Sequence, residues 1–244
     1  MRGMLIDTTL CVGCYACEEA DARRWGANAG EKHELSATLR TAVLDGNGVN
    51  VPRMCMHCGD PTCVSVCPVG ALKKASDGPV VYEADRCMGC RYCMQACPFN
   101  VPKYEWESLN PKIIKCDLCV ERVSEGKVPA CVEACAIGAR MHGTLEECAR
   151  EARRRIHSEP GKYVDRIYGI REAGGTSLLY ISDKPFESLG FGMTIPNHPL
   201  PDLTAVVLKK IPTYVGWSGT LLAGVWWITK RRADVATGEK GEGK

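Results

Sequence analysis

The stretch Cys87-Met88-Gly89-Cys90-Arg91-Tyr92-Cys93-Met94-Gln95-Ala96-Cys97-Pro98 decides the interpretation of this sequence. Two residues separate each of its first three cysteines, and a fourth cysteine follows after three more residues, directly before proline. This spacing is typical of a loop that binds a [4Fe-4S] cluster through three thiolates and donates the fourth thiolate to a second cluster. The stretch therefore predicts at least one pair of iron-sulfur clusters.

Three further groups of closely spaced cysteines repeat this pattern elsewhere in the chain. They comprise Cys11, Cys14 and Cys17 in the first group, Cys55, Cys58, Cys63 and Cys67 in the second, and Cys116, Cys119, Cys131 and Cys135 in the fourth. The second group widens one gap to four residues, which a turn at Pro61 accommodates. The fourth contains an insertion in which residues 126–129 predict a loop between two short helices. An apolar stretch at residues 4–6 predicts a strand before the first group.

The first group has Asp21 where its fourth cysteine would fall. A carboxylate is a harder ligand than a thiolate, but it can complete an iron site. We expect Asp21 to bind iron; a three-iron cluster or a water ligand are the alternatives at this cluster. The alternative without a function is that Asp21 is a solvated residue early in a helix. In the second group, His57 is expected to donate a hydrogen bond rather than to bind iron, because four thiolates are already present.

Composition narrows the classes of protein that this chain can represent. The 244 residues are 45% hydrophobic and 25% charged, which is ordinary for a globular protein, but they include sixteen cysteines. Disulfides are not expected, because the cysteines lie in close groups and no apolar signal segment opens the chain. The net charge of +2 and the lack of a basic patch among aromatic residues give no support for nucleic-acid binding. The main alternative to iron-sulfur clusters is structural zinc.

Cys148 stands apart from the four groups and is not expected to be a ligand. Thr144 and Glu147 form a capping-box pattern that predicts the start of a helix. Cys148 lies in the first turns of this helix, where a cysteine commonly serves as a small buried residue.

The last part of the chain contains no cysteine and changes in character. Glycines and prolines between residues 190 and 201 indicate an irregular connector. Residues 211–229 include no charged residue and just reach the roughly 20 residues needed for a helical span. Trp226 and Trp227, with basic residues 230–232 beyond them, are typical of an interfacial anchor. We expect one transmembrane helix within residues 206–232; a helix that docks on a partner protein is the alternative.

The four cysteine groups, together with residues 64–74, 100–104 and 174–181, resemble the four-cluster ferredoxin-type electron-transfer subunits of membrane-bound respiratory oxidoreductases. Within that family, the chain is most similar to the membrane-tailed subunit of uptake nickel-iron hydrogenases and next to the beta subunit of formate dehydrogenase. The resemblance implies an α+β fold with two dicluster ferredoxin-like halves in residues 1–160. A connector (161–205), a transmembrane anchor (206–232) and a polar tail (233–244) are expected to follow.

The resemblance also implies that paired groups exchange their fourth ligand, which gives four sites that we number here. The implied ligands are Cys11, Cys14, Cys17 and Cys135 for site I; Cys55, Cys58, Cys63 and Cys97 for site II; Cys87, Cys90, Cys93 and Cys67 for site III; and Cys116, Cys119, Cys131 and Asp21 for site IV. At least three sites are expected to hold [4Fe-4S] clusters. Site IV, where the family has cysteine instead of Asp21, is expected to hold a carboxylate-ligated [4Fe-4S] or a [3Fe-4S] cluster. We expect site IV at one end of the row of clusters.

The recognisable chemistry is one-electron transfer, since the chain has no nucleophile beside a base, no phosphate loop and no open metal site. The resemblance implies a non-catalytic subunit that relays electrons between a catalytic subunit, either a NiFe hydrogenase or a molybdopterin or tungstopterin enzyme, and a quinone-reactive membrane subunit. A zinc-stabilised scaffold and a self-contained enzyme are the alternatives.

The expected location is the cell membrane, with one crossing of the lipid bilayer. The basic residues after the span favour a cytoplasmic C-terminus and a cluster domain on the periplasmic or outer side. Cys11 lies too close to Met1 for a twin-arginine signal, so we expect export on a partner's signal. A cytoplasmic cluster domain is the alternative.

Overall fold

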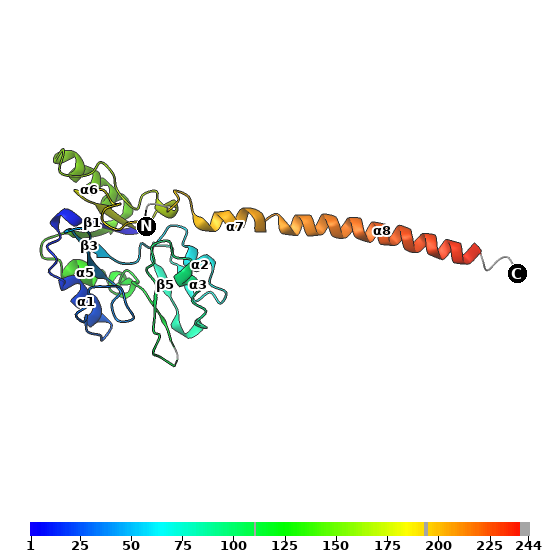
Figure 1. The fold of residues 1–244 in the computed structure, drawn as a ribbon, viewed down its shortest axis with the longest axis horizontal. Coiled ribbons are helices and arrows are strands. Elements are labelled where there is room, and N and C mark those ends of the chain that lie inside the picture. Colours follow the sequence, from blue (N-terminus) through cyan, green and yellow to red (C-terminus); the bar gives the residue numbers. More distant parts are fainter. Residues whose placement is uncertain (110, 193–194, 240–244) are drawn as a thin grey trace. The chain divides into compact units, whose positions relative to one another are not determined.

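The computed structural model describes residues 1–109, 111–192 and 195–239 (Figure 1). It divides into two compact units, Met1–Pro201 and Asp202–Lys244. All sixteen cysteines lie in the first unit, which therefore contains the four candidate sites. The predicted polar tail begins inside the second unit, and its residues 240–244 lie outside the described part of the chain.

Short strands and short helices alternate through the first unit. The strands are β1 (Arg2–Asp7), β2 (Ala42–Asp45), β3 (Asn50–Arg53), β4 (Leu72–Lys74), β5 (Val80–Tyr82), β6 (Lys103–Tyr104), β7 (Ile113–Ile114), β8 (Arg140–Thr144) and β9 (Leu178–Ile181). The α-helices are α1 (Ala16–Arg24), α2 (Thr62–Ser65), α3 (Tyr92–Gln95), α4 (Val120–Ser124), α5 (Ala130–Glu133) and α6 (Leu145–Ser158). The 3-10 turns are η1 (Thr8–Leu10), η2 (Ala84–Arg86) and η3 (Glu172–Gly174). This mixture confirms the predicted α and β content.

A three-stranded sheet, in the order β8-β1-β9, forms the centre of this unit. Strand β1 confirms the strand predicted at residues 4–6; it pairs antiparallel with β8 and parallel with β9. Because successive side chains in a strand point to opposite faces, β1 contributes to two cores. Leu5 packs in the core under α6, whereas Met4 and Ile6 pack in the core that contains cysteines of the four groups. The sheet therefore separates α6 from the candidate sites.

Helix α6 starts with the predicted capping box. The Thr144 side chain accepts a hydrogen bond from the Glu147 backbone N–H at 3.2 Å, and the Glu147 carboxylate accepts one from the Thr144 N–H at 2.8 Å. Cys148 is fully buried against the sheet, in the same core as Leu5 and Ala152. The structure thus confirms both the helix start and the packing role predicted for Cys148.

The remaining strands form three separate hairpins, β2-β3, β4-β5 and β6-β7. Helix α1 contacts α5, and α2 contacts α3. Figure 1 shows α2, α3 and β5 gathered in one part of the unit, and α1 and α5 in another. The first and fourth cysteine groups therefore share one half of the unit, and the second and third groups share the other half.

Residues 161–201, expected as a connector, are largely built into the first unit. Strand β9 pairs with β1, and the rings of Tyr168, Tyr180, Phe186 and Phe191 form a buried cluster in which Tyr168 and Phe191 lie 4.5 Å apart. The difference has a physical cause, because burial of these aromatic rings stabilises the segment against the sheet despite its many glycines and prolines. The compact unit accordingly extends to Pro201 and not to residue 160.

Helices α7 (Leu200–Leu208) and α8 (Ile211–Glu239) make up most of the second unit. Helix α8 covers the predicted transmembrane segment and is 29 residues long. Nevertheless, no helix within the described residues has both the length and the apolar character that membrane crossing requires. Glycine, serine and threonine residues in its charge-free stretch lower the average hydrophobicity of the helix. The predicted crossing at residues 206–232 is therefore not confirmed.

We predict that Thr144→Ala destabilises the first unit by about 1 kcal/mol, because the N–H groups at the start of α6 lose their side-chain acceptor. Anaerobic denaturant unfolding, followed by circular dichroism, would measure this free energy. Glu146→Ala is the matched control, since Glu146 is exposed in the same helical turn but outside the capping box. Equal stability of Thr144→Ala and Glu146→Ala would show that the box contributes nothing.

Candidate metal centres

The first Cys-x-x-Cys loop of each of the four groups has the same backbone feature. The third residue of each loop has a left-handed conformation: φ is +68° at Gly13, +47° at His57, +72° at Gly89 and +57° at Leu118. Glycine adopts this conformation without a steric penalty, whereas a residue with a side chain loses roughly 1–2 kcal/mol. The bend reverses the chain between two cysteines, which allows their thiols to approach the same point. Its repetition in four loops indicates that the four groups share one type of site.

Backbone N–H groups in these loops point at sulfur. The N–H of Gly89 donates to Cys87 Sγ at 3.4 Å, and the N–H of Leu118 donates to Cys116 Sγ at 3.3 Å. Hydrogen bonds of this kind favour the thiolate form, which is the form that binds iron. The loops therefore both position the ligands and stabilise their charge.

A second left-handed residue follows three positions after Cys67, Cys97 and Cys135. These residues are Gly70, Asn100 and Gly138, with φ of +60°, +51° and +66°. The equivalent residue after Asp21 is Arg24, which still lies inside helix α1. The Asp21 site thus departs from the others in its backbone as well as in its ligand.

Electrostatic interactions between thiols identify the groups that the structure brings together. Burial raises the pKa of Cys11, and Cys135 and Cys14 of site I raise it further. Burial and the other three thiols of site II raise the pKa of Cys58. Burial and the other three thiols of site III raise the pKa of Cys93 to about 11. The implied exchange of the fourth ligand is therefore compatible with the positions of these cysteines.

The order of the sites follows from interactions between thiols of neighbouring sites. Cys131 of site IV interacts with Cys17 of site I, and Cys116 of site IV interacts with Cys55 of site II. Cys63 of site II interacts with Cys93 of site III. Packing agrees with these interactions, since Cys17, Cys55, Cys116 and Cys131 share one core and Cys63 packs with Cys93 in another. This arrangement favours the order I–IV–II–III, with site IV inside the row, over the end position expected from the sequence. The spacing of cysteines within one group does not show which groups are neighbours in the fold, because packing in the common core determines those neighbours.

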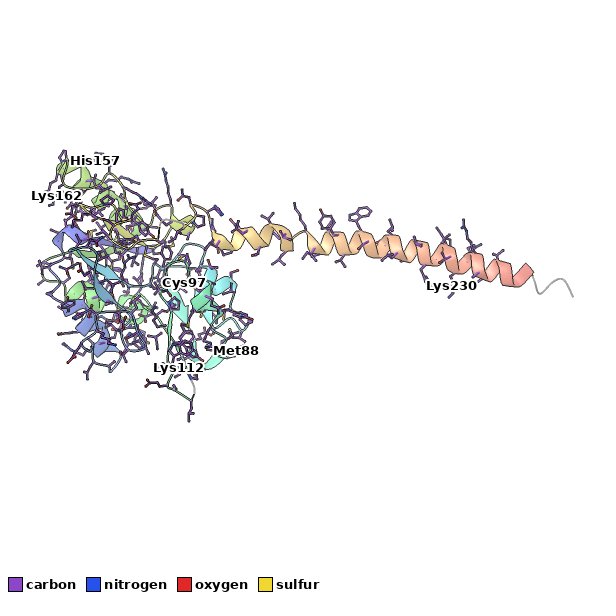
Figure 2. All side chains as sticks on the ribbon, in the orientation of Figure 1. Met88, Cys97, Lys112, His157, Lys162 and Lys230 are labelled. Atoms are coloured by element: carbon purple, nitrogen blue, oxygen red, sulfur yellow. The ribbon has the colours of Figure 1, made fainter. Side chains whose placement is uncertain are left out.

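Exposure of the loops to solvent follows the same order. Val12, inside the first Cys-x-x-Cys loop, is 67% exposed, and Met88, inside the third, is 65% exposed. Met56 and Leu118 in the loops of sites II and IV are only 4% and 2% exposed. Figure 2 labels Met88 in the same part of the unit as Cys97. The loops at the two ends of the row are therefore more open to solvent than the two loops between them.

All four candidate ligands of site IV are buried, whereas each of the other three sites has one buried ligand. The buried ones are Cys17, Cys55, Cys93, Cys116, Cys119, Cys131 and Asp21; those of intermediate exposure are Cys11, Cys58, Cys63, Cys67, Cys87, Cys90, Cys97 and Cys135; and Cys14 is exposed. No group of three His, Cys, Asp or Glu side chains is placed to hold a metal ion within the described ranges of the chain.

Asp21 is buried next to the thiols of site IV. Its side chain is on helix α1, where Oδ2 accepts a hydrogen bond from the Arg40 backbone N–H at 3.1 Å. Burial raises the pKa of Asp21, and the Arg40 N–H counteracts this. The charge of Asp21 acts on Cys116, Cys119 and Cys131, which are the three thiols of site IV. This position excludes the interpretation of Asp21 as a solvated residue.

His57 provides a separate test of whether site II fits a cluster. Its ring is fully buried, and Nδ1 accepts a hydrogen bond from the Val80 N–H at 2.9 Å. Burial keeps the pKa of His57 well below its usual value, so the ring is neutral and its proton is on Nε2. Nε2 has no hydrogen-bond partner among the described residues. A buried donor of this kind requires an acceptor, and the sulfur of a cluster beside Cys58 is chemically suited to that role.

Two buried or half-buried lysines near site II were not identified from the sequence. Lys115 Nζ donates to the Cys116 carbonyl at 2.8 Å, and Lys74 Nζ donates to the Cys58 carbonyl at 2.6 Å. The positive charge of Lys115 also lowers the pKa of Cys63, whose burial raises that pKa to about 12 overall. The closeness of these lysines to cysteines in the sequence was the signal that could have identified them.

Four kinds of observation together fit [4Fe-4S] clusters at these sites: the thiol ligands, the left-handed loops, the nearby cations and the buried His57 donor without a partner.

Comparisons with known proteins agree with this geometry. A family model described as a 4Fe-4S dicluster domain matches residues 47–145. A protein of Nitratidesulfovibrio vulgaris is 38% identical over 258 residues, covering 98% of this chain and 70% of that protein. The hydrogenase-2 operon protein HybA of Escherichia coli O157:H7 is 38% identical over 234 residues, covering 77% and 71%. The formate dehydrogenase-O iron-sulfur subunit of Escherichia coli K12 is 33% identical over 252 residues, covering 91% and 81%.

We predict that Asp21→Ala alters the spectrum and reduction potential of one cluster and leaves the other three unchanged, because only site IV loses a ligand. Asp21→Cys should retain iron at that site while shifting the same spectrum, since a softer thiolate replaces the carboxylate. Electron paramagnetic resonance (EPR) during a redox titration would measure both effects.

The control for these variants is Glu19→Ala, which removes an exposed carboxylate from the same helix. It should leave all four signals unchanged. If Asp21→Ala behaved like this control, Asp21 would not be an iron ligand.

Proposed function

This chain belongs to the family of iron-sulfur subunits of hydrogenases and formate dehydrogenases, and we propose that it relays electrons through four iron-sulfur clusters. The observation that supports this proposal is the row of sites I, IV, II and III, whose end loops are exposed and in which the four ligands of site IV are buried. A row with two accessible ends suits a protein that exchanges electrons with two different partners.

Clusters bound at these sites would supply one-electron transfer at potentials that the protein environment adjusts. The residues of this chain position the ligands, exclude water from site IV, and provide hydrogen bonds to sulfur. We assign no catalytic residue to the chain. Substrate conversion would take place on another subunit, and this chain would connect that subunit to an electron acceptor or donor.

We propose two kinds of partner for the ends of the row. One is a catalytic oxidoreductase subunit, either a NiFe hydrogenase or a molybdopterin or tungstopterin enzyme. The names of the relatives, which mention a hydrogenase and a formate dehydrogenase, support a catalytic partner of this kind. The other is an integral membrane subunit that reacts with quinone. In site IV, Asp21 would complete a [4Fe-4S] cluster or leave a [3Fe-4S] cluster, and both arrangements are compatible with electron transfer.

Helix α8 is our candidate for attachment to the membrane subunit. Large apolar side chains, including Leu221, Val225 and Trp226, are exposed along a stretch without charge. Three glycines in this stretch allow close approach of another helix. A partner helix would cover part of its polar surface and thereby compensate for its moderate hydrophobicity. The periplasmic or outer location of the cluster domain remains part of this proposal.

Purified under anaerobic conditions, the full chain should contain about sixteen iron atoms and a similar amount of labile sulfide, or slightly less if site IV holds a three-iron cluster. The preparation should be brown. Metal analysis and sulfide determination would measure this. A colourless protein that contains zinc without sulfide would overturn the proposed function and support a zinc-stabilised scaffold.

We predict that Leu221→Lys reduces the membrane-bound fraction of the complex by at least about tenfold, because Leu221 lies near the middle of the charge-free stretch and a lysine at the centre of an apolar helix costs about 2.5–3.5 kcal/mol in the bilayer. Sedimentation of membranes after a carbonate wash would measure the fraction. Val235→Lys is the control: Val235 is similarly exposed on α8 but lies beyond the basic residues 230–232. Equal membrane association of Leu221→Lys and Val235→Lys would contradict the role assigned to α8.

A further inference from the structure

Arg140 is a buried cation on the face of the sheet that borders the candidate sites. It begins β8, where it lies directly opposite Ile6 of β1. Directly opposed residues in a sheet share a face, and Ile6 packs in the core that contains Cys17 and Cys131. Arg140 is only 4% exposed to solvent. Strand pairing therefore directs this side chain towards sites I and IV.

The Arg140 guanidinium contacts a ligand sulfur directly. Its Nη2 donates to Cys17 Sγ at 3.2 Å, and its Nη1 donates to Met54 Sδ at 3.3 Å and to Thr41 Oγ1 at 3.4 Å. It also interacts with the Cys131 sulfur. Because Cys17 belongs to site I and Cys131 to site IV, one planar group connects two adjacent sites. Lysine could not replace this geometry, since its ammonium is a single point charge.

Sulfur is the source of the negative charge that balances Arg140. None of the ion pairs found in the described part of the chain gives this arginine a carboxylate partner. An arginine guanidinium keeps its positive charge in proteins, so Arg140 is a buried cation. A buried charge is unfavourable unless it is paired. The pairing here is with the ligands of two sites.

We propose that Arg140 stabilises the reduced forms of sites I and IV and thereby raises the reduction potentials of both. This inference rests on the proposed function, since it requires clusters at these sites. One-electron reduction of a cluster adds one negative charge without forming or breaking a bond, and the electron comes from the reduced partner subunit or, in the test, from dithionite. A fixed positive charge within hydrogen-bond distance of a ligand favours that added charge.

Two other cations contact backbone near the ligands and do not contact a ligand sulfur. Lys74 donates to the carbonyl of Cys58 in site II, and Lys115 donates to the carbonyl of Cys116 in site IV. Arg140 instead donates to a ligand sulfur, so its effect on potential should be larger and confined to sites I and IV. Removal of Arg140 should consequently alter two of four potentials.

The test uses the complete, cluster-loaded chain and the variants Arg140→Gln and Arg140→Lys in EPR-monitored redox titrations, with iron content measured in parallel. In Arg140→Gln, two reduction potentials should each fall by at least about 59 mV, which corresponds to a tenfold change in the equilibrium constant of a one-electron reduction. The other two should remain unchanged. In Arg140→Lys, one of the two should fall and the other should remain, because an ammonium reaches one of the two sites.

Arg53→Gln is the matched control, because Arg53 is a largely buried arginine of the same unit that donates to the Leu189 carbonyl and contacts the Phe191 ring. It should change no potential. If Arg140→Gln does not assemble, Arg140→Lys alone decides the question. Unchanged potentials in Arg140→Lys, or equal shifts at all four sites, would overturn the inference. An iron-free wild-type chain would instead refute the proposed function itself.

Discussion

The structure depends on one electrostatic constraint: many sulfur ligands must be buried close together while their negative charge is compensated. Thiolates avoid burial unless hydrogen bonds, cations or bound iron stabilise them. The left-handed bends meet part of this requirement by directing backbone N–H groups at sulfur, as Leu118 does towards Cys116. Arg140, Lys115 and Lys74 meet another part. The short helices and hairpins are arranged around these loops, and the central sheet supports them from one side.

The alternation of side chains along β1 places the core under α6 on one face of the sheet and the candidate ligands on the other. Leu5 packs against α6 with Cys148, the one cysteine outside the four groups. Met4 and Ile6 pack on the other face, beside Cys17 and Cys131. A capped helix therefore stabilises the sheet on one side, and the sheet fixes the ligand loops on the other. Electron transfer between sites requires such fixed positions, because the distances between clusters must not vary.

Much of the candidate site could be predicted from the sequence, since ligand spacing is set by local geometry. The four cysteine groups, the strand at residues 4–6 and the capping box at Thr144 follow from short-range patterns. The order of the sites could not be predicted, because the approach of Cys116 to Cys55 depends on packing between segments distant in the sequence. The contact between Arg140 and Cys17 could not be predicted for the same reason. The folding of residues 161–201 into the first unit reflects aromatic packing without a regular period.

The exposed loops at both ends of the row have a consequence for how the protein survives outside its complex. Molecular oxygen and other small oxidants reach Cys14 and the loop around Met88 far more readily than the buried ligands of the inner sites. Oxidative damage to an isolated chain should begin at its two ends and progress inwards. Partner subunits that cover these loops would consequently act as shields as well as electron carriers, which ties the lifetime of the clusters to prompt assembly.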